Sequence, residues 1–293
     1  LTQRDATVVL SEISDWWKEN RADEIRIYEE SVYPRGVAPE LVTDLGVLSH
    51  DVASRESWLE TFILGSTFTM GRTKAEAHRN FVRQMRNDGW LTKFATPNLD
   101  PAEFMNFLLG YFDHPNDRQD YYHWLRQFVT IFQLSRWLDD YAKIFLDLDK
   151  RDGFTLQTPL RNRRDYAYDF TGMNAPSLIP ALGYGACFIV RELARQKKLT
   201  SYNIHRYCYV PQARLRNFLG RLGCTGLDDG ITTERSAAIF EFLKNHLGDE
   251  ASFGGDFDLP LQIIASGKDD LWEHFLGTGR PEESELEEID DDE

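Results

Sequence analysis

The sequence predicts an all-α fold, on the basis of helical spacing, helix-start signals and the scarcity of strand patterns. Apolar residues recur every three or four positions in several stretches, as one face of a helix requires. One such stretch carries Trp58, Leu59, Phe62 and Ile63. Alternation of apolar and polar residues with a period of two, which is typical of half-buried strands, is hardly found. A fold based on a sheet is therefore not expected.

Start and stop signals place individual helices in the first half of the chain. Thr73 and Glu76 have the spacing of a capping box, and they open a helix that we expect to end near Gly89. Asp100 and Pro101 form an N-cap followed by a first-turn proline. This pair predicts a second helix start.

Similar signals continue in the second half. From Trp124 to Leu148 the apolar positions predict one long buried helix or two helices in tandem. The stretch 149–175 contains glycine and proline and is expected to be the longest connection between helices. Thr232 or Thr233 is placed to cap a later helix.

The net charge of −15 over 293 residues is unevenly distributed along the chain. Residues 280–293 hold nine acidic residues against one arginine, so we expect a mobile acidic tail there. Residues 161–221 hold eleven Lys or Arg against three acids, a net charge of +8. One basic segment in an acidic protein favours DNA as a partner. The expected organisation is an N-terminal helical extension over 1–50, a two-lobed domain over 51–279 and the tail.

Composition narrows the class of protein further. No apolar run approaches the roughly 18 residues that span a bilayer, and no secretory signal is visible, so we expect a cytoplasmic protein without a membrane partner. The three widely spaced cysteines, Cys187, Cys208 and Cys224, argue against a disulfide scaffold and against a metal cluster. No His, Cys or carboxylate spacing indicates a metal site, and no cofactor is expected.

The most informative stretch is a short turn, Leu182 to Gly185, between two helical patterns. Gly183 and Gly185 permit close approach of another molecule, and main-chain N–H groups at such a turn can bind a phosphate. Arg191 and Arg195 follow on the next helix. The alternative interpretation is an ordinary turn followed by a solvated basic face.

The stretch 174–223 resembles the helix-hairpin-helix region of the DNA glycosylase superfamily. Val210-Pro211 followed by basic residues resembles the Val-Pro element that starts a basic helix in that family. Upstream, 57–67 resembles the early helix at the base pocket, and downstream, 255–262 resembles a late pocket helix. The resemblance covers roughly 57–265 and lies in the order of these elements. It implies two helical lobes with a helix-hairpin-helix motif and a cleft between them.

The resemblance implies an enzyme that flips a base out of DNA and hydrolyses its N-glycosidic bond. The family's catalytic Asp at the start of the basic helix is missing, because Pro211, Gln212 and Ala213 stand there. Its lyase Lys is replaced by Ala186 and Cys187, so a monofunctional enzyme is expected. These departures from the family's catalytic residues suggest an unusual, modified base as substrate. A role in antiviral defence is an extension of that hypothesis.

Cleaving an N-glycosidic bond places positive charge on the sugar, so a nearby carboxylate is needed. Asp258 is the first candidate, because Asp258 and Gln262 are four apart and share one helical face in the pocket-like helix. The alternative is that Asp256 or Asp258 caps this helix before Pro260. Asp165 and Asp169, in the basic segment, are the second choice.

Further residues are assigned to the base pocket and to the DNA backbone. The expected pocket residues are Gln262, Thr67, Tyr184 and Tyr207. Tyrosine rings near the hairpin can stack on a flipped base, although packing in the core is an equal alternative for each ring. The expected DNA contacts are Gly183, Gly185, Arg191, Arg195, Arg206, Arg214 and Arg216.

Two other functions stay open. The stretch Tyr209 to Gln212 also resembles the Tyr-Arg-Val-Pro-Gln stretch of queuosine-nucleotide hydrolases, although their upstream Asp falls at Tyr207 here. A nucleoside or nucleotide N-glycosidase is therefore the second hypothesis, and a non-catalytic DNA-binding module is the third. The net charge of +8 favours DNA, since a small nucleoside does not need it.

Overall fold

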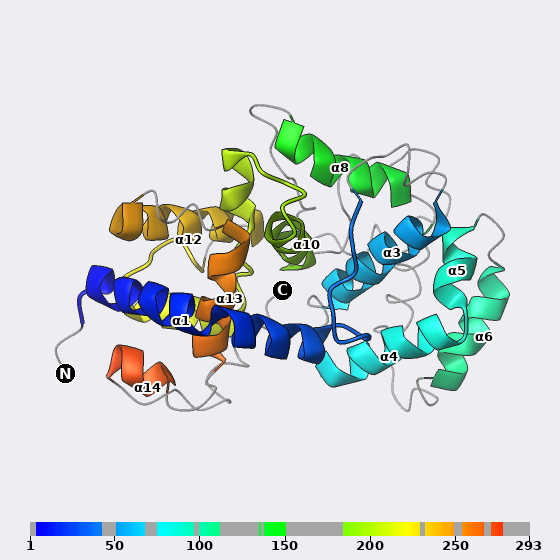
Figure 1. The fold of residues 1–293 in the computed structure, drawn as a ribbon, viewed down its shortest axis with the longest axis horizontal. Helices are drawn as coiled ribbons and strands as arrows, with labels where there is room; N and C mark the ends of the chain where they lie inside the picture. The colour runs from blue at the N-terminus through cyan, green and yellow to red at the C-terminus, as the bar shows by residue number, and fades with distance from the viewer. Residues whose placement is uncertain are drawn as a thin grey trace. The chain divides into compact units, whose positions relative to one another are not determined.

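The computed structural model describes residues 4–42, 51–67, 75–96, 100–111, 135, 138–150, 184–228, 232–248, 254–266 and 271–277 (Figure 1). The ordered elements in these ranges are helices, without a strand, which confirms the all-α prediction. They are α1 (Ala6–Val32), α3 (Val52–Thr67), α4 (Ala75–Asn87), α5 (Trp90–Ala95), α6 (Pro101–Tyr111), α8 (Leu138–Lys150), α10 (Tyr184–Arg195), η1 (Tyr202–Tyr207), α11 (Ala213–Arg221), α12 (Thr232–Leu247), α13 (Gly254–Ala265) and α14 (Leu271–Leu276).

The chain divides into two compact units, each assembled from separate stretches of sequence. Unit 1 consists of Leu1–Tyr28, Leu148–Leu156 and Ala186–Glu293. Unit 2 consists of Glu29–Asp147 and Gln157–Gly185. Most of α1 therefore belongs to the same unit as the C-terminal helices.

The core of unit 1 is formed by one face of α1 together with α11, α12, α13 and α14. Val9, Leu10 and Ile13 recur at helical spacing on α1 and are fully buried. They share one apolar cluster with side chains of the later helices, among them Leu215, Phe218, Phe240, Phe257, Leu261 and Trp272. Burial of such side chains supplies the main stabilising free energy of the unit.

Aromatic rings dominate the core of unit 2. Trp58 and Phe62 of α3 lie with ring centroids 5.3 Å apart, and Phe62 also contacts Phe145 of α8 at 5.7 Å. Phe94 and Phe104 meet edge to face at 4.6 Å, joining α5 to α6. Edge-to-face pairing is a preferred aromatic geometry, so α5 and α6 are joined by a specific contact as well as by burial.

The helix starts and stops agree in part with the sequence analysis. The carboxylate of Asp100 accepts the Ala102 N–H at 2.9 Å, which confirms the predicted cap of α6. α4 ends at Asn87, and Gly89 follows with a φ of 75°. α12 already begins at Thr232, so both predicted capping threonines lie inside its first turn. Thr73, most of 124–148 and nearly all of 149–175 lie outside the described residues.

Candidate functional site

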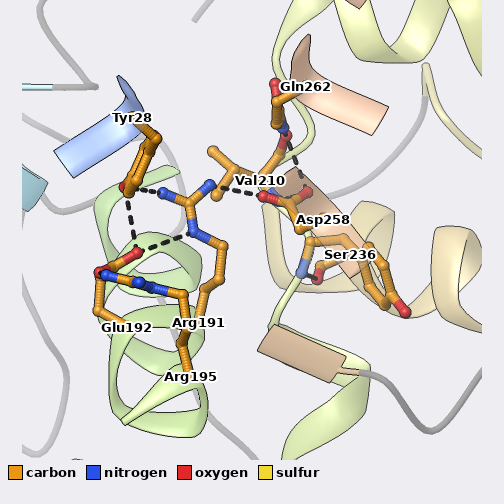
Figure 2. A network of polar contacts seen from close by, with 9 residues as sticks. Tyr28, Arg191, Glu192, Arg195, Val210, Ser236, Asp258 and Gln262 are labelled. Carbon is orange, nitrogen blue, oxygen red and sulfur yellow. Dashed lines mark hydrogen bonds and ion pairs between the residues drawn. The ribbon is translucent and has the colours of Figure 1, made fainter. Parts of the chain in front are cut away.

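A network of buried polar side chains lies in unit 1, and we name it the buried ionic cluster. Its members are Tyr28, Arg191, Glu192, Arg195, Asp258 and Gln262, from α1, α10 and α13 (Figure 2). Arg191, Glu192 and Asp258 are at most 3% exposed. Two arginines face two carboxylates, so the formal charges of the cluster balance.

Asp258 is fully enclosed and accepts hydrogen bonds on both carboxylate oxygens. Arg191 donates from Nη1 to Oδ2 over 2.6 Å. The backbone N–H of Val210 donates to Oδ1 over 3.1 Å, and the Gln262 side chain donates to the same oxygen over 3.2 Å. The Gln262 amide nitrogen also lies 2.6 Å from the Val210 carbonyl oxygen. The two side chains therefore hold both polar backbone groups of Val210, immediately before Pro211 and α11.

α13 brings its polar side chains to α10 because a glycine lets the two helices approach. Gly255, Asp258 and Gln262 recur at helical spacing and so lie on one face of α13. A Cβ atom added at Gly255 would lie 2.6 Å from the Arg191 carbonyl oxygen and 2.8 Å from the Arg195 nitrogen. Backbone contact at Gly255 thus places Asp258, one turn later, within reach of Arg191.

The other side of Arg191 is bound by α1 and by its own neighbour. The Tyr28 hydroxyl accepts from Nη2 over 2.5 Å and donates to Glu192 Oε1 over 3.1 Å. Arg191 Nε lies 3.2 Å from Glu192 Oε1, and Arg195 Nη2 donates to Glu192 Oε2 over 2.9 Å. The guanidinium of Arg191 also lies 5.2 Å from the centroid of the Tyr28 ring, a cation–π distance.

The environment shifts the titration of these groups in directions that follow from burial and charge. Burial raises the pKa of Asp258, and the opposing effects of Arg191, Val210 and Gln262 do not cancel it. Burial also raises the pKa of the Tyr28 phenol, which stays neutral and able to donate. Burial disfavours the charge of Arg191, but the carboxylates of Asp258 and Glu192 outweigh this effect and raise its pKa.

The structure therefore brings together three segments that the sequence analysis singled out separately. Arg191 follows the expected hairpin, Val210-Pro211 is the expected element before the basic helix, and Asp258 with Gln262 comes from the expected late helix. Their contacts brace the start of α11. In this arrangement Asp258 faces protein donors on both oxygens, and no solvent reaches it.

The predicted phosphate-binding arginines differ in exposure. Arg191 and Arg216 are buried, and the Arg195 side chain is only 7% exposed. Arg216 donates to the Leu227 carbonyl oxygen over 3.5 Å. Arg206 is exposed and Arg214 is half-buried. A count of basic residues cannot distinguish these cases, since each arginine adds the same charge whichever way its helix face turns.

Gly185 lies in the first turn of α10 and packs against α3. A Cβ atom there would overlap the carbonyl oxygen of Gly65, so the close approach that this glycine permits is made by a helix of the same unit. Tyr207 and Tyr209 are buried, as the core interpretation of these rings expects. The structure does not describe Gly183, Asp165, Asp169 or the side chains of Thr67 and Tyr184, which are predicted site residues.

The sequence analysis missed Tyr28 and Glu192. Tyr28 lies 163 positions before Arg191, and nothing local in α1 distinguishes it from the other tyrosines. In the sequence, Glu192 is one of the three acids within the basic segment 161–221. Its spacing to Arg195, three positions along one helix, is the signal that could have identified an internal ion pair.

No group of three or more His, Cys, Asp or Glu side chains in the described residues is arranged to hold a metal ion. No helix in the same residues combines the length and apolarity that crossing a membrane requires. Comparison with known proteins gave no matching family model, no matching curated protein and no matching solved structure. The interpretation of the site therefore rests on its own geometry.

Proposed function

We propose that the protein hydrolyses the N-glycosidic bond of a nucleotide in DNA and releases a modified base. The observation that supports this proposal is the convergence of α10, Val210-Pro211 and α13 in the buried ionic cluster. Each of these segments resembles a glycosylase element in its own sequence. Arg191 and Asp258 are 67 positions apart, so their contact depends on the tertiary fold.

Within this proposal Asp258 acts as a positioning residue. Its carboxylate is enclosed and engaged with Arg191, Val210 and Gln262, so it fixes the start of α11 and does not face a substrate. The reacting carboxylate is then Asp165 or Asp169, the second choice of the sequence analysis. A carboxylate near the sugar would stabilise the positive charge that develops as the base leaves.

The second candidate function is a nucleoside or nucleotide N-glycosidase. The burial of Arg191, Arg195 and Arg216 favours this function. These arginines bind groups within the protein, so their charge does not face a ligand. The charge available for a DNA backbone is therefore smaller than the sum over 161–221 suggests. A small substrate would not need that charge.

One assay separates the candidate functions. The protein is incubated with duplex DNA carrying unmodified, damaged or hypermodified bases, and with free nucleosides and nucleotides. Abasic sites are detected by alkaline cleavage and released bases by mass spectrometry. Release from DNA supports the proposal, and release from nucleosides or nucleotides alone supports the second candidate. DNA binding without any release would overturn both and indicate a non-catalytic module.

Variants assign the carboxylates in the same assay. We expect Asp165→Asn or Asp169→Asn to abolish base release while the melting temperature stays unchanged. We expect Asp258→Asn to lower the melting temperature while the folded fraction keeps its activity. A folded Asp258→Asn variant without activity would instead give Asp258 the catalytic role that the sequence analysis first assigned to it.

A further inference from the structure

Unit 2 carries a group of arginines next to a buried carboxylate, that of Glu60 on α3. Glu60 is fully buried, and Arg86 of α4 donates from Nη2 to its Oε2. Arg35, in the segment after α1, lies with Nη2 3.9 Å from the same oxygen. Arg83, three positions before Arg86 on α4, donates from Nε to the Pro34 carbonyl oxygen over 3.4 Å. We name Arg35, Arg83 and Arg86 the arginine patch.

The guanidinium group of Arg35 is open to a ligand. Its side chain is 44% exposed, and its ion pair with Glu60, at 3.9 Å, is too long for a hydrogen bond. Within the described residues, therefore, no protein acceptor takes its N–H groups. Arg191 and Arg195 differ in this respect, because both donate hydrogen bonds inside the buried ionic cluster.

The backbone that carries Arg35 is held in place. Tyr33 to Gly36 form a turn in which the Gly36 N–H donates to the Tyr33 carbonyl over 3.0 Å. Pro34 occupies the second position of this turn, where proline is favoured, and Tyr33 is fully buried. Arg83 binds the Pro34 carbonyl and so fastens the turn to α4. A ligand of Arg35 does not have to order this backbone.

The charge around the patch is positive on balance. Glu60 neutralises one arginine from beneath, and Glu30 is an exposed acid at the border, since a Cβ atom added at Gly36 would lie 3.9 Å from its side chain. The three arginines outnumber these two acids. In the sequence, residues 72–86 hold five Lys or Arg against one acid, so this is a second basic segment besides 161–221.

We propose that the arginine patch binds a phosphodiester group of the DNA backbone. Arg35 presents its planar fork of N–H donors, which fits two phosphate oxygens, and Arg86 adds charge beside it. The exposure of Arg35 favours a phosphate on a long chain, because small ligands are usually held in concave sites that enclose them. The inference rests on the proposed function in that DNA is the partner. It adds a contact in unit 2, whereas the contacts expected from the sequence lie between Gly183 and Arg216.

The test is fluorescence anisotropy with a labelled DNA duplex at several salt concentrations. Arg35→Ala should weaken binding about fivefold to tenfold at about 0.1 M salt and lower the slope of log K against log salt by about 0.9, the effect of one phosphate contact. Arg35→Lys keeps the charge and should keep the slope. The melting temperature of both variants should stay unchanged, because the Arg35 side chain makes no hydrogen bond within the described residues. Unchanged binding by Arg35→Ala, or no binding by the unaltered protein, would overturn the proposal.

Lys93→Ala is the matched control. Lys93 belongs to the same unit and its side chain is 42% exposed, close to the value for Arg35, but its ammonium is paired with Glu103. We expect Lys93→Ala to leave the affinity and the salt slope unchanged. If it weakens binding as much as Arg35→Ala does, the general charge of the protein explains the binding and the patch is wrong.

Inorganic phosphate distinguishes the backbone of DNA from a small phosphorylated ligand. We expect isothermal titration calorimetry of the unaltered protein with sodium phosphate to show no binding. Phosphate binding that Arg35→Ala abolishes, with DNA binding unchanged, would assign the patch to a small ligand and overturn the proposal.

The outcome is distinguishable from that of the proposed function, because binding is measured without base release. Weaker DNA binding by Arg35→Ala, with no base released from any substrate, would support the patch and refute the hydrolase. Base release by the unaltered protein, with unchanged DNA binding by Arg35→Ala, would do the reverse.

Discussion

At the scale of single residues, the pair formed by Arg191 and Asp258 illustrates how a buried charge is tolerated. Neither side chain could lie inside unit 1 alone, because removing an ion from water costs several kcal/mol unless it is paired and hydrogen-bonded. Arg191 satisfies this condition with Asp258, Tyr28 and Glu192, and Asp258 does so with three donors. The pair specifies which parts of α10 and α13 must meet.

Asp258→Ala should lower the free energy of unfolding by about 3–5 kcal/mol, since it removes one partner of a buried ion pair. Urea denaturation measures the loss. The matched control is Asp256→Ala on the same helix, whose partner Arg21 lies at the surface, with a side chain 49% exposed. We expect that control to cost less than about 1 kcal/mol. Equal losses would mean that Asp258 contributes no more than the partly exposed pair of Asp256 with Arg21.

At the scale of elements, the contact between α10 and α13 depends on the absence of a side chain at Gly255. The backbone of α10 lies where a Cβ atom would be, at 2.6 Å from the carbonyl oxygen of Arg191. Helix backbones rarely approach so closely, and small residues are what permits it. The glycine and the ion pair are therefore two parts of one contact, separated by a single turn of α13.

Gly255→Ala should separate the two helices and destabilise the protein by about 1–3 kcal/mol or more, as overpacking does. Thermal unfolding followed by circular dichroism measures the change. Gly220→Ala on α11 is the control, because nothing lies within 4 Å of its added Cβ. Alanine there should stabilise the helix by up to about 1 kcal/mol. If Gly255→Ala left the stability of the protein unchanged, α13 could move away from α10 without a loss of stability.

The sequence predicts features of these helices that depend on neighbouring residues. It does not predict contacts between residues that are far apart in the sequence. Asp100 and Pro101 identify the start of α6 because a cap and its helix are neighbours in sequence. Glycine before α10 and the spacing of Asp258 and Gln262 also point to helices that the structure contains. The bond between Tyr28 and Arg191 has no such local signal, because the two residues are joined only when the core of unit 1 has formed.

At the scale of the whole molecule, the net charge of the basic segment 161–221 is the main evidence for DNA as a partner. It is also the least specific evidence. The sum of +8 over 161–221 counts every basic residue equally, and Arg191, Arg195 and Arg216 are among the five arginines expected to contact DNA. The structure places Arg191, Arg195 and Arg216 inside, where they neutralise acids or bind carbonyl groups. Charge summed along a chain indicates a partner class, but only the fold decides which charges face outward.

Arg206→Ala should weaken DNA binding for all sequences alike and lower the slope of log K against log salt by about 0.9, the effect of one phosphate contact. Arg206 is suited to this test because it is exposed on η1. Anisotropy titrations at several salt concentrations measure the slope. A loss confined to some sequences would instead assign Arg206 to base recognition.

The discontinuity of unit 1 has a consequence for the timing of synthesis. At about 5–20 residues per second, a ribosome needs roughly 10–50 s to proceed from Tyr28 to Asp258. During that interval the apolar face of α1, with Val9, Leu10 and Ile13, lacks the complete set of later helices that cover it. A chain that stops short of Asp258 leaves Arg191 with Tyr28 and Glu192 but without the carboxylate of α13.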